Sequence, residues 1–286
     1  MPKIDLRRPT PEDTAELGRI CFEAFKDVSE SHGFKSDFTT IEMAQGIVGG
    51  MIRDETVYGI AAIVDGELAG SNFAFRSDEA AGIGPVSVDP SLQGLGLGRR
   101  VMEDVLRYSA ESGFEMLRLV QDAFNMVSMS LYASLGFDAR APIGLLQLNP
   151  GTTPDDRIRI LTPDEAGAAD DLCRTIYHIS RRNELAHRAR TGSPTLGIFR
   201  GGSLRGYLCP GLIGHGVAET EDDMLALMRE AGRLTPGPTG AICPLTEGNL
   251  FRRALADGHR LSKIMNLMTI GPYQEPDGVW IPSVGF

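Results

Sequence analysis

The chain has 286 residues, of which 42% are hydrophobic, and a formal net charge of −10. This length allows two domains, because domains commonly run about 100 to 200 residues. The acidic balance argues against binding to nucleic acid or anionic membranes, which would repel it. No apolar run reaches the ~18 residues of a membrane span, and residues 1–9 lack the apolar core of a secretory signal, so we expect a cytoplasmic protein.

Hydrophobic periodicity predicts an α/β chain with a mixed sheet. A turn at Asp65 and Gly66 joins two of the expected strands, and three consecutive strands are expected to form an antiparallel meander. For the first half we expect a strand at 4–8, helices at 11–26 and 36–52, strands at 57–64, 68–75 and 82–88, a helix at 98–112, a strand at 116–121, a helix at 126–135 and a strand ending near 148.

A loop at 149–156 (NPGTTPDD) has turn residues and no periodicity, which predicts a boundary between domains at 1–150 and 151–286. The same order of elements then returns. We expect a strand at 157–161, a helix at 163–190, strands at 195–200, 204–210 and 212–218, a helix at 220–233, a strand at 240–243, a helix at 248–256 and a strand at 261–270. Two halves with one element order indicate an internal duplication.

The four cysteines are far apart, mostly within apolar stretches, and form no C-x-x-C pair. We therefore expect buried free thiols in a reducing compartment and no metal site. They are Cys21, Cys173, Cys209 and Cys243.

The most informative segment is VSVDPSLQGLGLGRR at 86–100, where a strand enters a glycine loop and then a helix. Glycines at 94, 96 and 98 let the backbone approach a ligand closely, and the first N–H groups of a helix are unpaired and attract anions. This arrangement favours a pyrophosphate ligand. A P-loop would need lysine and then serine or threonine after the last glycine, and a dinucleotide-binding G-x-G-x-x-G starting at Gly94 would need glycine at Arg99.

The segment resembles the Q/R-x-x-G-x-G/A signature of the GNAT superfamily of N-acetyltransferases, with Gln93, Gly96 and Gly98 at the signature positions. Residues 125–137 (NMVSMSLYASLGF) are similar to a second family segment, N-x-x-A-x-x-L-Y-x-x-x-G-F, with Ser128 in place of the usual alanine. The resemblance covers about residues 82–140. It implies a GNAT-like fold, here duplicated in tandem.

The resemblance also implies acetyl-CoA as cosubstrate and an amine-bearing small molecule or peptide as acceptor, which attacks directly. Tyr132 would protonate the departing thiolate, and the Val88 N–H would stabilise charge on the thioester oxygen. Asn125 would help to hold the cofactor arm. The residues expected at the cofactor are Val86, Val88, Gln93, Gly94, Leu95, Gly96, Leu97, Gly98, Arg99, Arg100, Asn125 and Tyr132.

Each of these residues also has an ordinary structural interpretation. The glycines could form a plain connection, Tyr132 could be a core aromatic and Asn125 an N-cap. At the level of function, a CoA-binding sensor without turnover or an interaction module remains open. Acetyl transfer to an amine would separate these classes.

The general base that takes the proton of an ammonium acceptor is not apparent, because the strand at 82–86 carries no acid. Glu79 and Asp122 are the nearest carboxylates, and either could instead be a solvated loop charge. The uncharged tail at 278–286 holds the only tryptophan, so it should dock on the protein and could carry the Phe286 carboxylate into the site.

The second half departs from the family pattern where the cofactor would bind. The glycine loop is replaced by residues 218–223 (AETEDD), whose carboxylates would repel a pyrophosphate. Asn249 corresponds to Asn125, but Ala256 stands where Tyr132 would be expected. We therefore expect a catalytically silent copy that shapes the acceptor cleft or an oligomer contact such as that of a homodimer.

Overall fold

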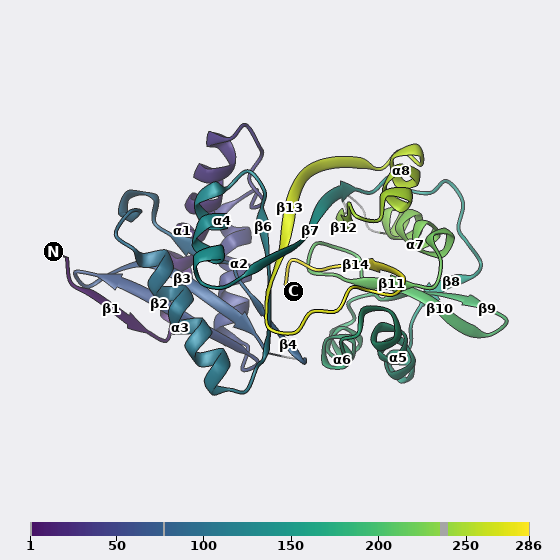
Figure 1. Ribbon diagram of the computed structural model, residues 1–286, viewed down its shortest axis with the longest axis horizontal. Helices are drawn as coiled ribbons and strands as arrows, with labels where there is room; N and C mark the ends of the chain where they lie inside the picture. Colours follow the sequence, from purple (N-terminus) through teal and green to yellow (C-terminus); the bar gives the residue numbers. More distant parts are fainter. Residues whose placement is uncertain (1, 77, 235–239, 286) are drawn as a thin grey trace. The chain divides into compact units, whose positions relative to one another are not determined.

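The computed structural model describes residues 2–76, 78–234 and 240–285. Contacts between residues divide the chain into two compact units, and the chain passes between them several times (Figure 1). The first unit comprises Met1–Ser77, Ala81–Leu117 and Phe124–Phe137, and the second comprises Asp78–Ala80, Arg118–Ala123 and Asp138–Phe286.

The sheet of the first unit runs in the order β1-β2-β3-β4, and β5 also pairs with β3. Its strands are β1 (Ile4–Arg7), β2 (Val57–Val64), β3 (Glu67–Phe75), β4 (Ala80–Ile83) and β5 (Ser87–Val88). All these pairings are antiparallel, and the β2–β3 hairpin turns at Asp65 and Gly66, as the sequence predicted. The expected meander is therefore confirmed.

The helices of the first unit cover this sheet. They are α1 (Thr14–Ser31), α2 (Ile41–Arg53), α3 (Leu97–Glu111) and α4 (Met126–Ser134), with 3₁₀ turns at η1 (Pro11–Asp13) and η2 (Pro90–Leu92). Leu17 and Ile20 of α1 share a buried cluster with Val48 of α2 and Phe73 of β3. The second helix was expected to begin at residue 36, but Thr40 is its N-cap, since its hydroxyl accepts the Met43 N–H at 3.2 Å.

The strand expected at 82–88 is interrupted in the structure. Ile83 of β4 pairs with Ala74, and a regular register would then pair residue 87 with Gly70. Instead, Ser87 pairs with Ser71, so one extra residue is accommodated between β4 and β5, as in a β-bulge. The sequence pattern alone did not show that this strand divides.

The second unit contains a sheet with the strand order β6-β13-β7-β12. These strands are β6 (Met116–Asp122, of which Arg118 onward belongs to this unit), β7 (Asp138–Gln147), β12 (Gly240–Pro244) and β13 (Arg260–Ile270). The strand β7 pairs antiparallel with both β12 and β13. The residues before the loop at 149–156 are therefore packed with residues that follow it.

A five-stranded sheet in the second unit has the order β14-β11-β10-β9-β8, with all pairings antiparallel. Its strands are β8 (Ile158–Ile160), β9 (Leu196–Arg200), β10 (Ser203–Leu208), β11 (Gly216–Ala218) and β14 (Val279–Ile281). The helices of this unit are α5 (Ala166–Tyr177), α6 (Arg182–Thr191), α7 (Glu221–Leu234) and α8 (Gly248–Ala256), with a 3₁₀ turn at η3 (Pro163–Glu165). Only residues 216–218 of the strand expected at 212–218 are extended in the sheet.

The single helix expected at 163–190 was wrong, because α5 ends at Tyr177 and α6 begins at Arg182. His178 follows α5 in the left-handed conformation, with φ of 60°. The carboxylate of Asp170 accepts the Ser180 hydroxyl at 2.9 Å and the Arg181 N–H at 2.7 Å. These contacts satisfy polar groups at the break between α5 and α6. They cannot be predicted from hydrophobic periodicity.

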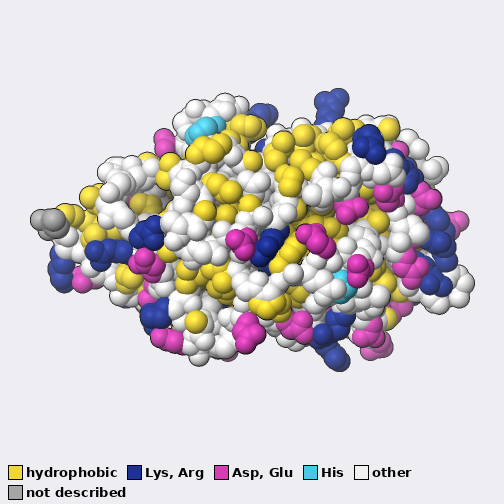
Figure 2. Space-filling model, viewed as in Figure 1, with side chains coloured by type: hydrophobic (Ala, Val, Ile, Leu, Met, Phe, Trp, Pro, Cys, Tyr) yellow, Lys and Arg dark blue, Asp and Glu magenta, His cyan; other side chains and the backbone are white. Residues whose placement is uncertain are grey.

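The tail docks as predicted, because Trp280 lies in β14, paired with Val217 and only 2% exposed. All four cysteines are free and buried, so the prediction of buried free thiols is confirmed. Among the described residues on the face in Figure 2, acidic and basic side chains are interspersed, and that face shows no broad basic patch of the kind that binds a phosphate backbone.

Candidate functional site

The glycine loop leaves β5 at Val88 and enters α3 at Leu97. The Asp89 carboxylate accepts both the N–H and the hydroxyl of Ser91, at 3.0 and 2.6 Å, and starts the turn η2. These hydrogen bonds lower the pKa of Asp89, with the Ser91 hydroxyl making the largest contribution. The loop therefore begins from a fixed anchor at the end of the strand.

The backbone N–H groups in the first turn of α3 are not capped by a side chain. The N-cap residue is Gly96, which has no side chain to accept a hydrogen bond from these N–H groups, and the first turn contains no acidic residue. The first N–H groups of a helix have no partner within the helix, and its dipole places partial positive charge there. This end of α3 is suited to an anion.

The three loop glycines contribute in two ways. Gly94 and Gly96 have φ of +83° and +78°, which side chains rarely adopt, and a Cβ on either would meet no atom within 4 Å. Gly98 has no such φ, and a Cβ there would lie 3.6 Å from Leu131 Cδ2 and 3.9 Å from Val88 Cγ2, at ordinary contact distance. The protein itself thus leaves room above the loop backbone.

The backbone N–H of Val88 points away from β3. Asp89 donates its own N–H to the Ala69 carbonyl at 2.9 Å, and successive residues of a strand direct their N–H groups to opposite edges. Among the described strands, β5 pairs only with β3, so its other edge carries no strand. Gly70 permits this arrangement, because a Cβ there would lie 2.5 Å from the Ser87 carbonyl oxygen.

The second half of the helix α4 contacts the first turn of α3. Asn125 is its N-cap, and its side chain accepts the Ser128 N–H at 3.0 Å. Arg99 of α3 donates to the Ser134 hydroxyl at 2.5 Å, which links the first turn of α3 to the last turn of α4. Together with Leu131 beside Gly98, this contact brings the two sequence segments of the motif together.

Tyr132 lies on α4 and is 8% exposed. Its ring meets that of Phe137 edge-on, and its carbonyl accepts the Phe137 N–H at 3.1 Å where the helix ends. Tyr132 therefore has the packing of a core aromatic, and its chemical role stays a prediction.

Residues 19–137 match the model of the Acetyltransferase (GNAT) family. This match contains the whole glycine loop and the α4 segment. This match identifies a GNAT acetyltransferase segment that spans less than half of the 286-residue chain. The chain is an acyl-CoA N-acyltransferase, which its match to this acetyltransferase family supports.

Solved structures described as acetyltransferases have a fold similar to that of the chain over nearly all of its length. A protein of Pyrococcus horikoshii described as a candidate acetyltransferase has a TM-score of 0.78 at 15% identity, over 96% of this chain and 94% of that one. A GCN5-related N-acetyltransferase of Sphaerobacter thermophilus has a TM-score of 0.64 at 15% identity, over 95% and 97%. The enzyme of the same description from Kribbella flavida gives 0.56 at 13%, over 94% and 71%.

At such low identity these similarities show a shared fold and do not indicate the acceptor.

No curated protein matches the sequence. In the described part of the chain, no helix is long and apolar enough to cross a membrane.

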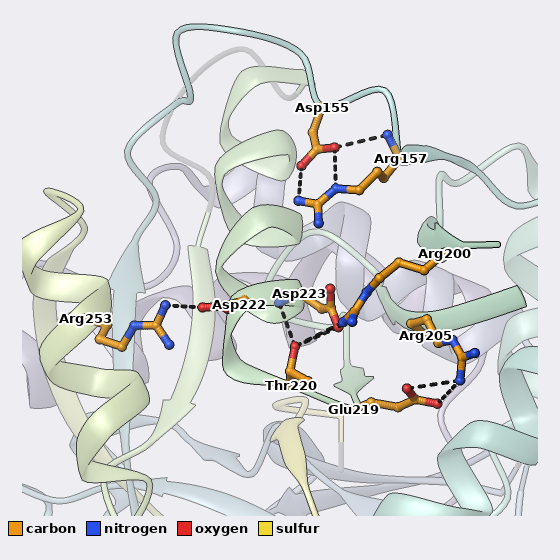
Figure 3. Close-up of polar contacts among 9 residues, drawn as sticks. All are labelled: Asp155, Arg157, Arg200, Arg205, Glu219, Thr220, Asp222, Asp223 and Arg253. Atoms are coloured by element: carbon orange, nitrogen blue, oxygen red, sulfur yellow. Dashed lines mark hydrogen bonds and ion pairs between the residues drawn. The ribbon is translucent and has the colours of Figure 1, made fainter.

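The second half contrasts with the glycine loop where β11 leads into α7 (Figure 3). The first turn of α7 holds three acids, and the Thr220 hydroxyl accepts the Asp223 N–H at 3.2 Å as a cap. Three arginines from other elements pair with the carboxylates around this turn: Arg200 with Asp223, Arg205 with Glu219, and Arg253 with Asp222 and Glu221. The Asp223 N–H and the three basic side chains at this helix start are thus engaged by the protein itself.

The three candidate bases have different surroundings. The Glu79 carboxylate pairs with Arg174 at 2.9 Å and accepts the Ser180 N–H at 3.0 Å, all within the second unit. Asp122 is no solvated loop charge, because it is 12% exposed and pairs with Lys263 at 2.6 Å. Phe286 lies outside the described residues.

Leu131 stands at the leucine of the family segment, but its place beside Gly98 was not predicted. The contact of Ser134 with Arg99 was missed. The spacing of three between Leu131 and Ser134 places both on one face of α4, which is the one signal that could have identified these contacts.

Proposed function

We propose that the chain transfers the acetyl group of acetyl-CoA to an amine by direct attack, and that acetyl-CoA binds to the first unit. The observation that carries this proposal is the uncapped start of α3, next to a Val88 N–H that points to a strand-free edge. Both sets of donors lie on one connection between β5 and α3. An anion and a carbonyl of the same ligand could engage them together.

Each part of the site has a separate task in this proposal. The N–H groups of residues 93–99 hold the pyrophosphate, and Arg99 or Arg100 adds positive charge. The Val88 N–H donates to the acetyl carbonyl, where one well-placed donor contributes about 3 kcal/mol. Asn125 fixes the start of α4, and Tyr132 supplies a proton to the leaving sulfur.

The bound cosubstrate supplies the activated thioester acetyl group. We propose Glu79, the acid that directly precedes β4 in the sequence, as the base that takes the proton of the acceptor. Its contacts with Arg174 and with the Ser180 N–H use one lone pair on each oxygen, and a carboxylate has about four such sites. The carboxylate therefore keeps the capacity to accept a further hydrogen.

We propose further that the two halves arose by tandem duplication. In the order β6-β13-β7-β12, the strands β6 and β7 come from the first half of the sequence and β12 and β13 from the second. If β12 is the counterpart of β6, and β13 that of β7, the order is the same when read from either end. In that scheme each half inserts its last strand into the sheet of the other. The repeated order of helices and strands supports the same conclusion.

The second copy is proposed to be silent. Its counterpart of the cofactor loop is filled by carboxylates and arginines, as described above. The strand β14 pairs with β11 and contacts β12, so it lies where the duplication scheme would place a cofactor arm. The tail of the chain therefore closes this copy.

Substitution of Gly98 by alanine tests the cofactor site. The new Cβ fits the protein but stands beside the donors of the first turn of α3. Calorimetry should show acetyl-CoA binding weakened by about tenfold or more, while thermal stability is kept or raised, because alanine favours helix. Gly46→Ala is the matched control, since Gly46 lies in α2 and is exposed, with nothing within 4 Å of its Cβ position.

Equal affinities of the Gly98→Ala, Gly46→Ala and parent proteins would contradict this location of the cofactor site. Release of free thiol from acetyl-CoA with a panel of amines tests turnover separately. Binding without any transfer would favour a CoA sensor over an enzyme.

A further inference from the structure

The second unit contains a buried arginine with which no carboxylate of the described residues pairs. Arg118 of β6 is 2% exposed. Its Nη2 donates a weak hydrogen bond to the Pro272 carbonyl at 3.4 Å, and its guanidinium lies over the Tyr273 ring, 5.0 Å from the ring centroid. Within the described residues, its Nε and Nη1 are buried without a hydrogen-bond partner. An isolated buried charge is costly and normally has a partner.

Two tyrosine hydroxyls near Arg118 are also without partners among the described residues. Tyr177, at the end of α5, is 3% exposed, and both its hydroxyl and that of Tyr273 are buried and unbonded. Tyr177 and Tyr273 are the neighbours whose electrostatic effects on Arg118 are largest. One cluster thus holds buried N–H and O–H donors that lack an acceptor.

The charge of the cluster indicates the class of the missing acceptor. Arg140 lies over the same Tyr273 ring at 5.2 Å, but it pairs with Asp138 at 2.8 Å and donates to the Thr269 hydroxyl. Burial lowers the pKa of Arg118, and the nearby Arg140 lowers it further. One guanidinium is therefore left uncompensated, which a single negative charge would balance.

We propose that Arg118, Tyr177 and Tyr273 form a binding site for the carboxylate of a small organic acid. A carboxylate brings one charge and several acceptor lone pairs, which match one guanidinium and two hydroxyls. Phosphate carries about −1.5 to −2 at neutral pH and would leave charge uncompensated. The site lies in the second unit and needs no bound acetyl-CoA.

The chain provides its own reporter for this site. Trp280 is the only tryptophan, and its ring stacks on Tyr177 with centroids 5.1 Å apart. Tryptophan fluorescence should therefore respond when a ligand engages the Tyr177 hydroxyl. The full chain is titrated with sodium propionate, with sodium chloride and sodium phosphate at equal ionic strength as comparisons.

We expect a saturable change with propionate that chloride and phosphate do not reproduce. Arg118→Met should weaken propionate binding at least tenfold, whereas Arg107→Met, at a 55% exposed arginine of α3, should not change it. Without ligand, Arg118→Met should unfold at the same temperature as the parent or a higher one, because it removes an unpaired buried charge.

Tyr177→Phe keeps the ring stacked on Trp280 and removes one donor, so propionate affinity should fall about tenfold without loss of folding. This variant keeps the test valid if Arg118→Met does not fold. Equal responses to chloride and propionate, a stronger response to phosphate, or unchanged propionate affinity in Tyr177→Phe would each overturn the proposal.

Discussion

The ring of Tyr132 packs edge-on against that of Phe137, with centroids 6.1 Å apart and an angle of 60° between the planes. Tyr132→Phe keeps this contact and removes only the hydroxyl. If the hydroxyl protonates the leaving thiolate, kcat should fall by about 10²-fold while acetyl-CoA affinity is unchanged. Steady-state kinetics with calorimetry measures both quantities. Unchanged turnover would show that Tyr132 is a core residue only.

The ion pair between Arg200 and Asp223 at the start of α7 leads to a prediction of stoichiometry. Because carboxylates and arginines fill that helix start, acetyl-CoA should bind once per chain. Calorimetric titration of the full chain measures the ratio directly. Two sites of equal affinity would contradict the silent second copy, and loss of the single site in Gly98→Ala would assign it to the first unit.

Much of the fold was predictable from local pattern. The loop from Val88 to Leu97 could be identified in the sequence from the spacing of its glycines. Residues without a Cβ allow the close approach of a backbone to an anion. The hairpin at Asp65 and Gly66 and the limits of α3 follow equally from turn residues and periodicity.

The parts that sequence reasoning missed depend on contacts between distant residues. The break after Tyr177 is stabilised by Asp170 through side-chain hydrogen bonds, while the apolar spacing continues across it. The strand β13 pairs with β6 and β7, which lie far from it in the sequence. The hydrophobic pattern of a strand does not specify which other strand it pairs with. Arg118 had no motif to mark it, since only its burial makes it unusual.

The pair Arg181 and Glu184 should contribute strongly to stability. Arg181 is 3% exposed, and its Nε lies 2.8 Å from the Glu184 carboxylate. Glu184→Gln should lower the free energy of unfolding by about 3 kcal/mol, because it weakens the compensation of a buried charge. Glu16→Gln is the control, since Glu16 pairs with Arg19 at the same sequence spacing but is 45% exposed, and it should cost less than about 1 kcal/mol. Equal costs in urea unfolding would contradict this prediction.

His215 should make stability depend on pH. It is 2% exposed, its Nδ1 lies 3.2 Å from the Glu184 carboxylate, and its Nε2 lies 2.8 Å from the Tyr207 hydroxyl. Burial lowers its pKa from 6.5, against an opposing effect of Glu184. The unfolded chain therefore binds a proton more readily, so the stabilising contribution is complete above about pH 6.5 and is lost as pH falls toward the folded pKa.

The measurement for His215 is the slope of unfolding free energy against pH between 7 and 5. The slope should be smaller in His215→Asn than in the parent, by at most about 1.4 kcal/mol per pH unit. His32→Asn, at an exposed histidine, should leave it unchanged. Identical slopes for the parent and both variants would show that His215 takes up its proton as easily in the folded protein as in the unfolded one.

Glu79 can be separated from its structural contact by a pair of variants. Glu79→Gln keeps an oxygen to accept the Ser180 N–H and removes the basic carboxylate, whereas Arg174→Met breaks the same ion pair and leaves the carboxylate in place. If Glu79 takes the proton of the acceptor, Glu79→Gln should reduce kcat/KM by at least about 10²-fold and remove the acid limb of its pH profile. Arg174→Met should keep that limb. Equal losses of stability in the two variants, with no change in either pH profile, would mean that Glu79 only holds Arg174 and Ser180 in place, and that another group takes the proton.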